Sequence, residues 1–461
     1  MRVLIFFILA TILPILSGCG NGARKEFNRL LVELADKDQL VDGSDWKQIS
    51  AFIDRNKAHF KDFYDHGRLD VDDVEDYIRD FFSHRRPPKD IRFSDIDGKA
   101  VTFHIFLEQS ASMQAYDSPK GDGSFRAAIM SLQNSLPGQT KVEHIGEKGY
   151  TDFRSIFDNI LNRTGKNEVS ILVSDLIYSV KDMQGVNPQK VFNELQEMVN
   201  AVFKDEVRRK SMLVVRMTGS YNGPYYSFDN QPHPYDGRRP YYIVVVADND
   251  VMKQLTTDSR FRSFADMPKL RGYDNMVLFT SDDIYEPYYS LLLNNKALRG
   301  HFHPERGQSD RITRLNDIEP DKDSGDIQLA LAVDLSKMFI DPRYLTDKNN
   351  YVVLSDDDVR IKEIRPIDKS DITPAEKKYI GSATHIFILS ANRISNDQEV
   401  EIELRNQLPQ WVNACSSEND VKPDATTTFG LRYLLGGIYD SYMRNAEHDA
   451  NYFELELHLD K

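Results

Sequence analysis

The sequence is poor in cysteine, has no excess of positive charge and contains no long apolar run. Its only two cysteines among 461 residues, Cys19 and Cys415, exclude a disulfide framework. It carries 58 Lys and Arg residues against 72 Asp and Glu residues, a formal net charge of −14. Because nucleic-acid binding requires clustered cations, we expect no nucleic-acid partner. The apolar run over residues 3–16 is shorter than the roughly 20 residues of a membrane-spanning helix.

The N-terminal residues have the pattern of a signal peptide. Arg2 precedes the apolar run, and small residues follow it directly before Cys19, as in secretory signals. The ending Leu16-Ser17-Gly18-Cys19 resembles the lipobox of bacterial lipoproteins, in which the cysteine is acylated, for example with palmitate, and becomes the first residue. The resemblance implies a signal peptide over residues 1–18 and a lipid anchor at Cys19.

A lipid anchor at Cys19 implies that the protein is held at a membrane of the cell envelope. Gly20 is not the aspartate associated with inner-membrane retention, so the outer membrane is the expected location. The alternative is an ordinary secretory signal cut after Gly18, which would leave a soluble protein. Cys415 has no histidine near it in sequence and is interpreted as a small buried apolar residue.

Residues 19–90 are predicted to form a lipidated tether and a helical region. Apolar residues recur at helical spacing in three segments, near residues 27–34, 46–53 and 71–81. Residues 70–80 are acidic but lack the glycine of an EF-hand loop, so we interpret them as a solvated helix face. The Arg85-Arg86-Pro87-Pro88 sequence ends the helical pattern and indicates a boundary.

Residues 91–305 are predicted to form an α/β domain with a doubly wound, mostly parallel sheet. Continuous apolar strands alternate here with amphipathic helices, a pattern typical of sheets that are covered on both faces. Ligands of such sheets bind at the carboxyl ends of the strands. The predicted strands are 101–108, 141–146, 168–174, 211–217 and 241–247, and the predicted helices are 123–136, 151–162, 187–208 and 249–256.

Oxygen-bearing side chains follow three of these strands. Glu108, Ser110 and Ser112 end the first strand, Thr151 precedes the helix after the second, and Asp175 ends the third. We expect these residues to meet at one edge of the sheet. Hydroxyl and carboxylate oxygens are the ligands that hard divalent cations require. The sequence therefore predicts a divalent cation site, with Mg²⁺ as the expected ion and Ca²⁺ or Mn²⁺ as alternatives.

This arrangement resembles the metal-ion-dependent adhesion site of von Willebrand factor A (vWA) domains, whose pattern is D-x-S-x-S, then a threonine, then an aspartate. The resemblance covers about residues 99–300. It implies that Ser110, Ser112, Thr151 and Asp175 are ligands, while Glu108 replaces the first aspartate and is one methylene longer. The alternative is that Ser110, Ser112 and Thr151 cap helices and that Asp175 accepts backbone hydrogen bonds.

Two further groups of residues in this domain have open interpretations. Residues 219–242 are rich in Gly, Pro and Tyr. They form either a loop that covers the cation site or a long hairpin whose tyrosines pack on the domain's own flank. His233, and separately the pair His301 and His303, suggest a zinc site, but the sequence shows no third ligand at a defined spacing from the pair.

Residues 310–461 are predicted to form a β-rich, sandwich-like domain. Short alternating strands are separated by turn residues, and one helix, about Thr427–Met443, interrupts them. We interpret the acidic loop Asp321–Asp326 as an exposed linker, and Glu399, Glu401 and Glu403 as the solvated face of a strand. The predicted strands lie near residues 327–333, 351–354, 385–389, 400–404 and 453–459.

The function predicted from these features is that of a membrane-anchored envelope lipoprotein whose vWA-like domain binds a protein partner through the cation. The first alternative is a metal-free scaffold within an envelope complex. The second is a metal-dependent hydrolase. The sequence has no G-x-S-x-G elbow, P-loop or dinucleotide-binding glycine motif, so we expect no enzymatic activity and assign no catalytic residue.

Overall fold

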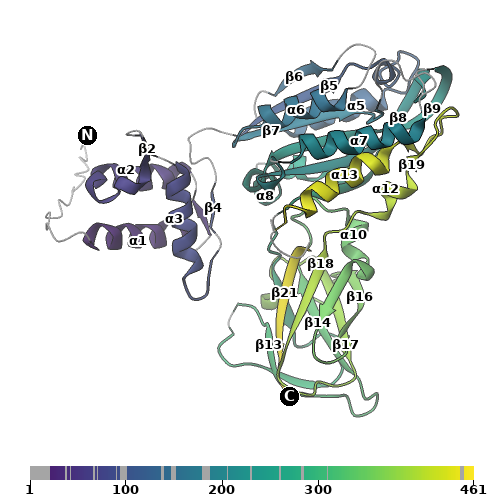
Figure 1. Cartoon of the computed structure of the whole chain (residues 1–461). Helices are drawn as coiled ribbons and strands as arrows, with labels where there is room; N and C mark the ends of the chain where they lie inside the picture. Colours follow the sequence, from purple (N-terminus) through teal and green to yellow (C-terminus); the bar gives the residue numbers. More distant parts are fainter. Residues whose placement is uncertain are drawn as a thin grey trace, which may run out of the picture. The chain divides into compact units, whose positions relative to one another are not determined.

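The computed structural model (Figure 1) describes most of the chain. The lipidation residue Cys19 and the predicted ligand Thr151 lie outside the described residues. In the part that is described, no helix combines the length and the apolar character needed to cross a bilayer. The described ranges are 21–36, 39–41, 43–65, 68–69, 71–89, 91–93, 101–136, 140–146, 152–178, 187–204, 206–228, 231–258, 261–281, 285–308, 310–446 and 451–461.

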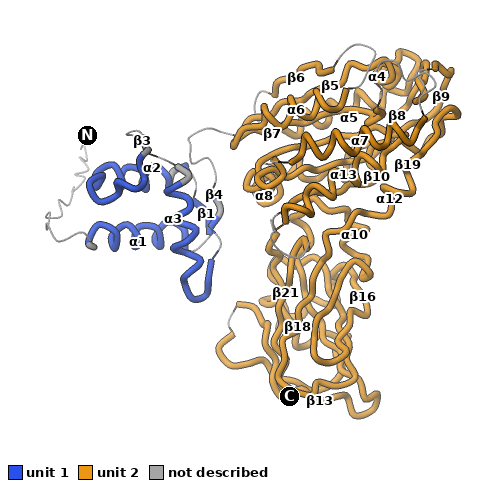
Figure 2. Tube along the Cα trace, in the orientation of Figure 1, with its two compact units in different colours: residues 1–100 blue, residues 101–461 orange. Residues whose placement is uncertain are grey.

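The chain divides into two compact units, residues 1–100 and residues 101–461 (Figure 2). The first unit contains the three predicted helices, α1 (Asn21–Ala35), α2 (Gly43–Arg55) and α3 (Val71–Ser83). Their apolar faces meet in a core of their own that includes Phe27, Ile49 and Ile78. The acidic residues 71–80 are helical, which confirms the prediction of a helix instead of a calcium loop.

The second unit contains a six-stranded sheet in which parallel and antiparallel pairs are mixed. β5 pairs in parallel with both β6 and β7, whereas the β7–β9, β9–β8 and β8–β10 pairs are antiparallel. The α/β class is confirmed, but the sheet is parallel only over β5, β6 and β7. In spatial order the strands are β10 (Tyr273–Phe279), β8 (Lys210–Tyr226), β9 (Pro232–Asp248), β7 (Glu168–Ser174), β5 (Thr102–Glu108) and β6 (Lys141–Ile145).

Helices cover both faces of this sheet because its strands carry apolar residues on both sides. Ile105 and Ile171 face one layer, which contains α5 (Ser124–Ser135) and α8 (Asn249–Thr257). Phe106 and Leu172 face the other layer. That layer contains α6 (Phe153–Arg163), α7 (Pro188–Val202) and α13 (Leu431–Met443). The helix predicted over residues 187–208 ends at Val202 in α7, and a short 3-10 turn, Glu206–Arg208, precedes β8.

β8 and β9 form one long hairpin, which explains the antiparallel half of the sheet. Only five residues separate β8 from β9, too few for the crossover that a parallel pair needs, so the strands must run in opposite directions. The hairpin continues beyond the Arg216–Tyr242 pair as far as Tyr226 and Pro232. Tyr221, Tyr225 and Tyr241 of this extension are fully buried. The hairpin alternative for residues 219–242 is thus confirmed.

Two further sheets follow, and they share buried residues of one core. The predicted strands near residues 327–333, 351–354, 385–389, 400–404 and 453–459 are all present. The four-stranded sheet is β11 (Tyr289–Leu292), β14 (Ile327–Val333), β17 (His385–Ala391) and β16 (Arg360–Pro366). The five-stranded sheet is β12 (His301–Pro304), β13 (Arg314–Glu319), β21 (Asn451–Leu459), β18 (Gln398–Arg405) and β15 (Tyr351–Leu354).

The segment between β18 and β21 packs on the six-stranded sheet instead of on its own neighbours in sequence. It contains α12 (Gln410–Ala414) and α13, and α13 packs against α7 (Figure 1). Phe192 of α7 stacks on Tyr433 of α13, with ring centroids 4.1 Å apart. The hydroxyl oxygens of Tyr242 and Thr428 are 2.9 Å apart. A sequence-distant segment therefore supports the strands that lead to the predicted site.

The hairpin extension lies tightly against the turn after β5. The amide of Asn222 donates to the carbonyl of Ala115 at 3.0 Å, and a Cβ at position 223 would lie 2.9 Å from Cβ of Ala115. We expect Gly223→Ala to lower the free energy of unfolding by about 1–3 kcal/mol through overpacking. Ala115→Gly in the same chain should restore part of that loss. Urea unfolding of both variants measures this; wild-type stability of Gly223→Ala would contradict it.

Candidate functional site

The turn after β5 carries the first three predicted ligands. Glu108 is the last residue of β5, and Ser110 is at the N-cap position of the short helix α4 (Ala111–Gln114). The Ser110 side chain makes no capping hydrogen bond; instead its Oγ lies 3.1 Å from Oγ of Ser112. Both hydroxyls are buried. The capping alternative therefore does not account for Ser110.

The end of β7 brings a carboxylate and a hydroxyl to the same edge of the sheet. The Ser174 hydroxyl donates a hydrogen bond to Oε2 of Glu108. The next residue, Asp175, accepts from the amide of Ile177 at 3.2 Å through Oδ1, and the Ser112 hydroxyl is near enough to lower the pKa of its carboxyl. Its Oδ2 is buried and, among the described residues, has no hydrogen-bond partner. Ser110 and Ser112 thus contact each other, and Ser112 acts on the nearby carboxyl of Asp175.

The backbone after Asp175 is strained. Leu176 has φ +51°, in the left-handed region that non-glycine residues seldom occupy. The Leu176 side chain is buried in the core layer that also contains α6 and α7. Such strain persists only where the surroundings enforce it, and it concentrates at functional sites. The turn is therefore a second reason, besides the partnerless oxygen, to place the site at Asp175.

The charge of Asp175 is buried and needs compensation. Its side chain is 1% exposed, and this burial raises the pKa of the carboxyl, while the Ser112 hydrogen bond and the nearby Arg239 guanidinium lower it. Tyr116 is buried beside it, and burial together with the charge of Asp175 holds the pKa of that phenol well above its usual range. The Tyr116 hydroxyl therefore stays protonated and donates to the carbonyl of Pro240.

Arg239 places a buried positive charge near Asp175. It comes from the hairpin extension, and it is 1% exposed. Its guanidinium donates to the carbonyls of Asp424 at 2.7 Å and Thr427 at 3.3 Å, and it lies 4.3 Å from the ring centroid of Tyr225. It forms no direct ion pair with Asp175 within the described residues, so it acts on that carboxylate through the low-dielectric interior.

No motif in the sequence indicated that Arg239, Ser174 and the C-terminal segment that holds Arg239 contribute to this site. Arg238 and Arg239 are adjacent in sequence, but strand alternation points them to opposite faces. Arg238 is exposed and lies 3.4 Å from Asp122, whereas Arg239 is buried. Strand alternation alone predicts that one of the two arginines faces inward. Which of them does so depends on the register of the hairpin, and the sequence pattern does not determine that register.

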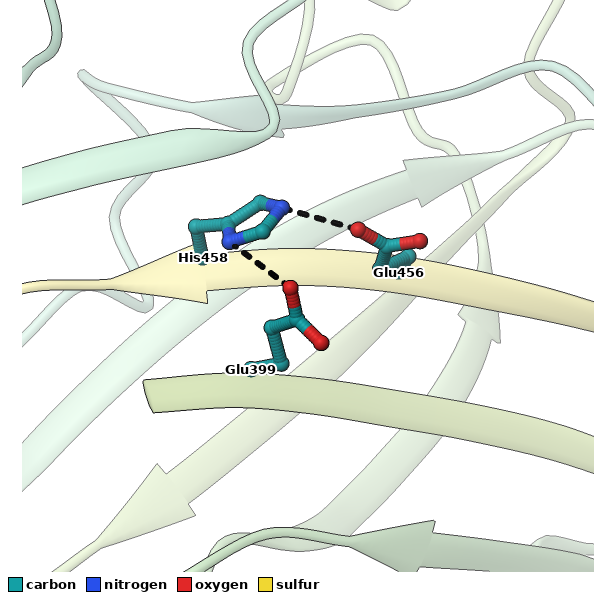
Figure 3. A group of neighbouring side chains, drawn as sticks. All are labelled: Glu399, Glu456 and His458. Carbon is teal, nitrogen blue, oxygen red and sulfur yellow. Dashed lines mark hydrogen bonds and ion pairs between the residues drawn. The ribbon is translucent and has the colours of Figure 1, made fainter. Parts of the chain in front are cut away.

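Among the described residues, His233, His301 and His303 do not form a metal-binding group. His233 lies 3.0 Å from Oγ of Ser227, and His301 and His303 contact each other with ring centroids 4.7 Å apart. Across the described ranges, one group of three His, Cys, Asp or Glu side chains has ligand atoms within 4.8 Å of one another. It consists of Glu399, Glu456 and His458 (Figure 3), where the sequence predicted only a solvated strand face.

Removing the Arg239 charge should destabilise the protein because Asp175 then lies buried without a nearby cation. We expect the double variant Arg239→Met/Asp175→Asn to be more stable than the sum of the single variants by about 0.5–3 kcal/mol. Arg239→Met should recover stability on acidification, since a carboxyl with a raised pKa binds its proton in the folded state. Urea unfolding at neutral and acidic pH measures the coupling and the pH effect, with Arg238→Met as the control. If the effects of the two single variants on the free energy of unfolding simply add in the double variant, the proposed coupling is wrong.

Comparisons with known proteins give no relative for this arrangement. No family model matches the chain. The searches of curated proteins and of solved structures also found no significant match. The site is therefore interpreted from its own geometry.

Proposed function

We propose that the turn after β5 and the end of β7 hold a divalent cation, with Mg²⁺ as the expected ion. Neighbouring ligands of an octahedral Mg²⁺ lie about 3 Å apart, given metal–oxygen distances of about 2.1 Å. The 3.1 Å separation of the Ser110 and Ser112 hydroxyls fits this spacing. The buried Asp175 Oδ2 supplies the negative charge. Glu108 would contribute after release from Ser174 or through water, and Thr151 is the further expected ligand.

The observation that carries this proposal is that Oδ2 of Asp175 has no hydrogen-bond partner within the described part of the chain. Leaving a buried carboxylate oxygen without a donor costs free energy, and a cation would remove that cost. We propose that the six-stranded sheet belongs to a vWA-like domain, and that the cation binds a carboxylate of a protein partner. The partner would approach beside Ser112, which at 9% is the most exposed of the described ligands.

The wider proposal is an envelope lipoprotein anchored at Cys19 in the outer membrane. In it, the helices of residues 21–83 follow the anchor, and the two C-terminal sheets form a β-sandwich that supports the partner-binding domain. The 14-residue length of the apolar run 3–16 and the Leu16-Ser17-Gly18-Cys19 ending support this assignment. No observation favours hydrolysis, since neither Ser110 nor Ser112 is hydrogen-bonded to a histidine among the described contacts.

A metal-free scaffold is the second candidate, and Arg239 is the observation that favours it. A buried guanidinium already offsets part of the Asp175 charge, and Ser174 already occupies one oxygen of Glu108. In that case the fold would keep the adhesion-type loops without an ion. The two candidates differ in whether the oxygens of Ser110, Ser112 and Asp175 bind Mg²⁺.

Calorimetric titration of the full chain with Mg²⁺ and Mn²⁺ separates these candidates. We expect one bound ion, and a loss of affinity of at least about tenfold, or 1.4 kcal/mol, in Ser110→Ala/Ser112→Ala. The control is Ser118→Ala, since Ser118 lies on the same segment and its hydroxyl accepts from the exposed Lys120 amide at 3.4 Å. Capture of an envelope protein should be EDTA-sensitive and lost in the same double variant. Equal affinity in the double variant and the control would refute the cation site.

The anchor has its own test. Cells fed an alkyne-tagged palmitate should label the wild-type chain and carry it in the outer-membrane fraction, because acyl chains bury about 0.8 kcal/mol per CH₂ in the bilayer. Cys19→Ser should abolish the label and move the protein out of the membrane fraction. Cys415→Ser, which removes the only other cysteine, should behave like wild type. A label that persists in Cys19→Ser would rule out the lipoprotein assignment.

A further inference from the structure

Two glutamates and a histidine gather on the solvent-facing side of the five-stranded sheet (Figure 3). Glu456 and His458 alternate on β21, and Glu399 of β18 lies directly opposite His458. Oε1 of Glu456 is 2.8 Å from Nε2 of His458, and Oε1 of Glu399 is 3.6 Å from its Nδ1. The imidazole therefore lies between two carboxylates that come from neighbouring strands.

The backbone that carries these residues is held by regular strand pairing. β18 and β21 pair antiparallel, in unbroken register from Gln398–Leu459 to Leu404–Phe453. The alternate residues, such as Val400, Leu455 and Leu457, are fully buried on the opposite side. The ligand-bearing positions are thus fixed before any ion binds, and only side-chain torsions need to adjust. Such preorganisation lowers the free-energy cost of binding.

We propose that one imidazole nitrogen of His458 and the carboxylates of Glu399 and Glu456 bind a first-row transition metal ion, with Zn²⁺ as the reference ion. One ligand atom from each side chain lies within 4.8 Å of the others, close enough to surround one ion. A mixed nitrogen and oxygen donor set suits Zn²⁺, Ni²⁺ or Cu²⁺ and differs from the all-oxygen set that Mg²⁺ requires. This site is separate from the adhesion-type site and does not depend on it.

Binding one ion requires one glutamate side chain to turn, because the two carboxylates contact different nitrogens of the His458 ring. Zinc binds histidine nitrogen and carboxylate oxygen at about 2.0–2.2 Å, so that neighbouring ligand atoms in a tetrahedral site lie about 3.3 Å apart. For an ion on Nε2, the Glu456 contact must open slightly from 2.8 Å. The Glu399 carboxylate, now 3.6 Å from Nδ1, must turn toward the same ion. The two glutamates are 56–60% exposed, so an ion can reach the site and keep water or a partner's donor as a further ligand.

The charges around the cluster favour a cation. Glu401 lies directly opposite Glu456, and Glu403 lies opposite Glu454, so like charges face each other across the two strands, which is unfavourable. Burial, Glu454 and Glu401 raise the pKa of Glu403, against the opposing effect of Arg405. On the strand next to β21 on its other edge, Arg314 of β13 is aligned with His458. The Arg314 guanidinium, however, pairs with the Glu305 carboxylate at 3.6 Å. A divalent ion would reduce the repulsion between the paired glutamates.

The competing interpretation is an exposed ion-pair network in which a protonated His458 bridges the two glutamates without any metal. The two interpretations predict opposite behaviour toward added metal. Metal ligation requires a neutral imidazole and releases protons, so that metal affinity falls on acidification. An ion-pair network instead shows no saturable response to Zn²⁺.

The test is a Zn²⁺ titration of the full chain, monitored by calorimetry against a chromophoric chelator, with Co²⁺ absorption as a second readout of the ligand geometry. The exposed pair His301 and His303 on β12 is first removed in a His301→Ala/His303→Ala background. We expect this background to bind one Zn²⁺, and the further change His458→Ala to weaken it by about 10–100-fold. Affinity should fall between neutral and mildly acidic pH.

Isosteric variants keep the test independent of folding. Glu456→Gln and Glu399→Gln preserve side-chain volume, and each should weaken Zn²⁺ binding by about tenfold or more. Glu401→Gln is the matched control, because Glu401 faces Glu456 but is not one of the three ligands. Ser110→Ala/Ser112→Ala should leave Zn²⁺ binding unchanged. The proposal is overturned if the background binds no Zn²⁺ at millimolar concentration, or if His458→Ala and both glutamine variants bind it as tightly as the background does.

Discussion

A buried carboxylate is the constraint on which the arrangement of the six-stranded sheet and its neighbours depends. Asp175 is 1% exposed at the end of β7, and an isolated charge at that depth is strongly unfavourable. The described structure offers it a hydroxyl from Ser112, an amide from Ile177 and the nearby charge of Arg239. These groups leave Oδ2 without a donor. A cation held jointly with the serine hydroxyls would complete the compensation.

The Arg239 contribution depends on residues far away in sequence. The hairpin of β8 and β9 carries Arg239 beyond the edge of the sheet, and the carbonyls of Asp424 and Thr427 hold its guanidinium. The Tyr225 hydroxyl donates to Asp420 of the same C-terminal segment. The segment between β18 and β21 therefore contributes to a site whose ligands among the described residues come from the turn after β5 and the end of β7. Loss of that docking would remove the compensating charge from Asp175.

The sequence predicted local features well and long-range placement less well. The helices α1–α3 and the strands β5–β7 follow from apolar periodicity, which depends only on neighbouring residues. The contact of Ser110 with Ser112 follows from their spacing after β5, and the position of Asp175 from the rule on strand ends. The antiparallel pairing of β8 to β10, the burial of Arg239 and the docking of α13 depend on tertiary register, for which periodicity carries no signal. The pairing of Glu399 with His458 likewise required the register of β18 on β21.

Anomalous diffraction from crystals grown with Mn²⁺ tests the central claim most directly. Mn²⁺ takes the same oxygen ligands as Mg²⁺ and scatters anomalously, so its position is seen without assuming a ligand set. The account predicts a peak about 2.2 Å from the side-chain oxygens of Ser110, Ser112 and Asp175. Density for the Arg239 guanidinium in direct contact with Asp175 Oδ2, with no anomalous peak beside it, would contradict the account and identify a site that has replaced its ion with an arginine.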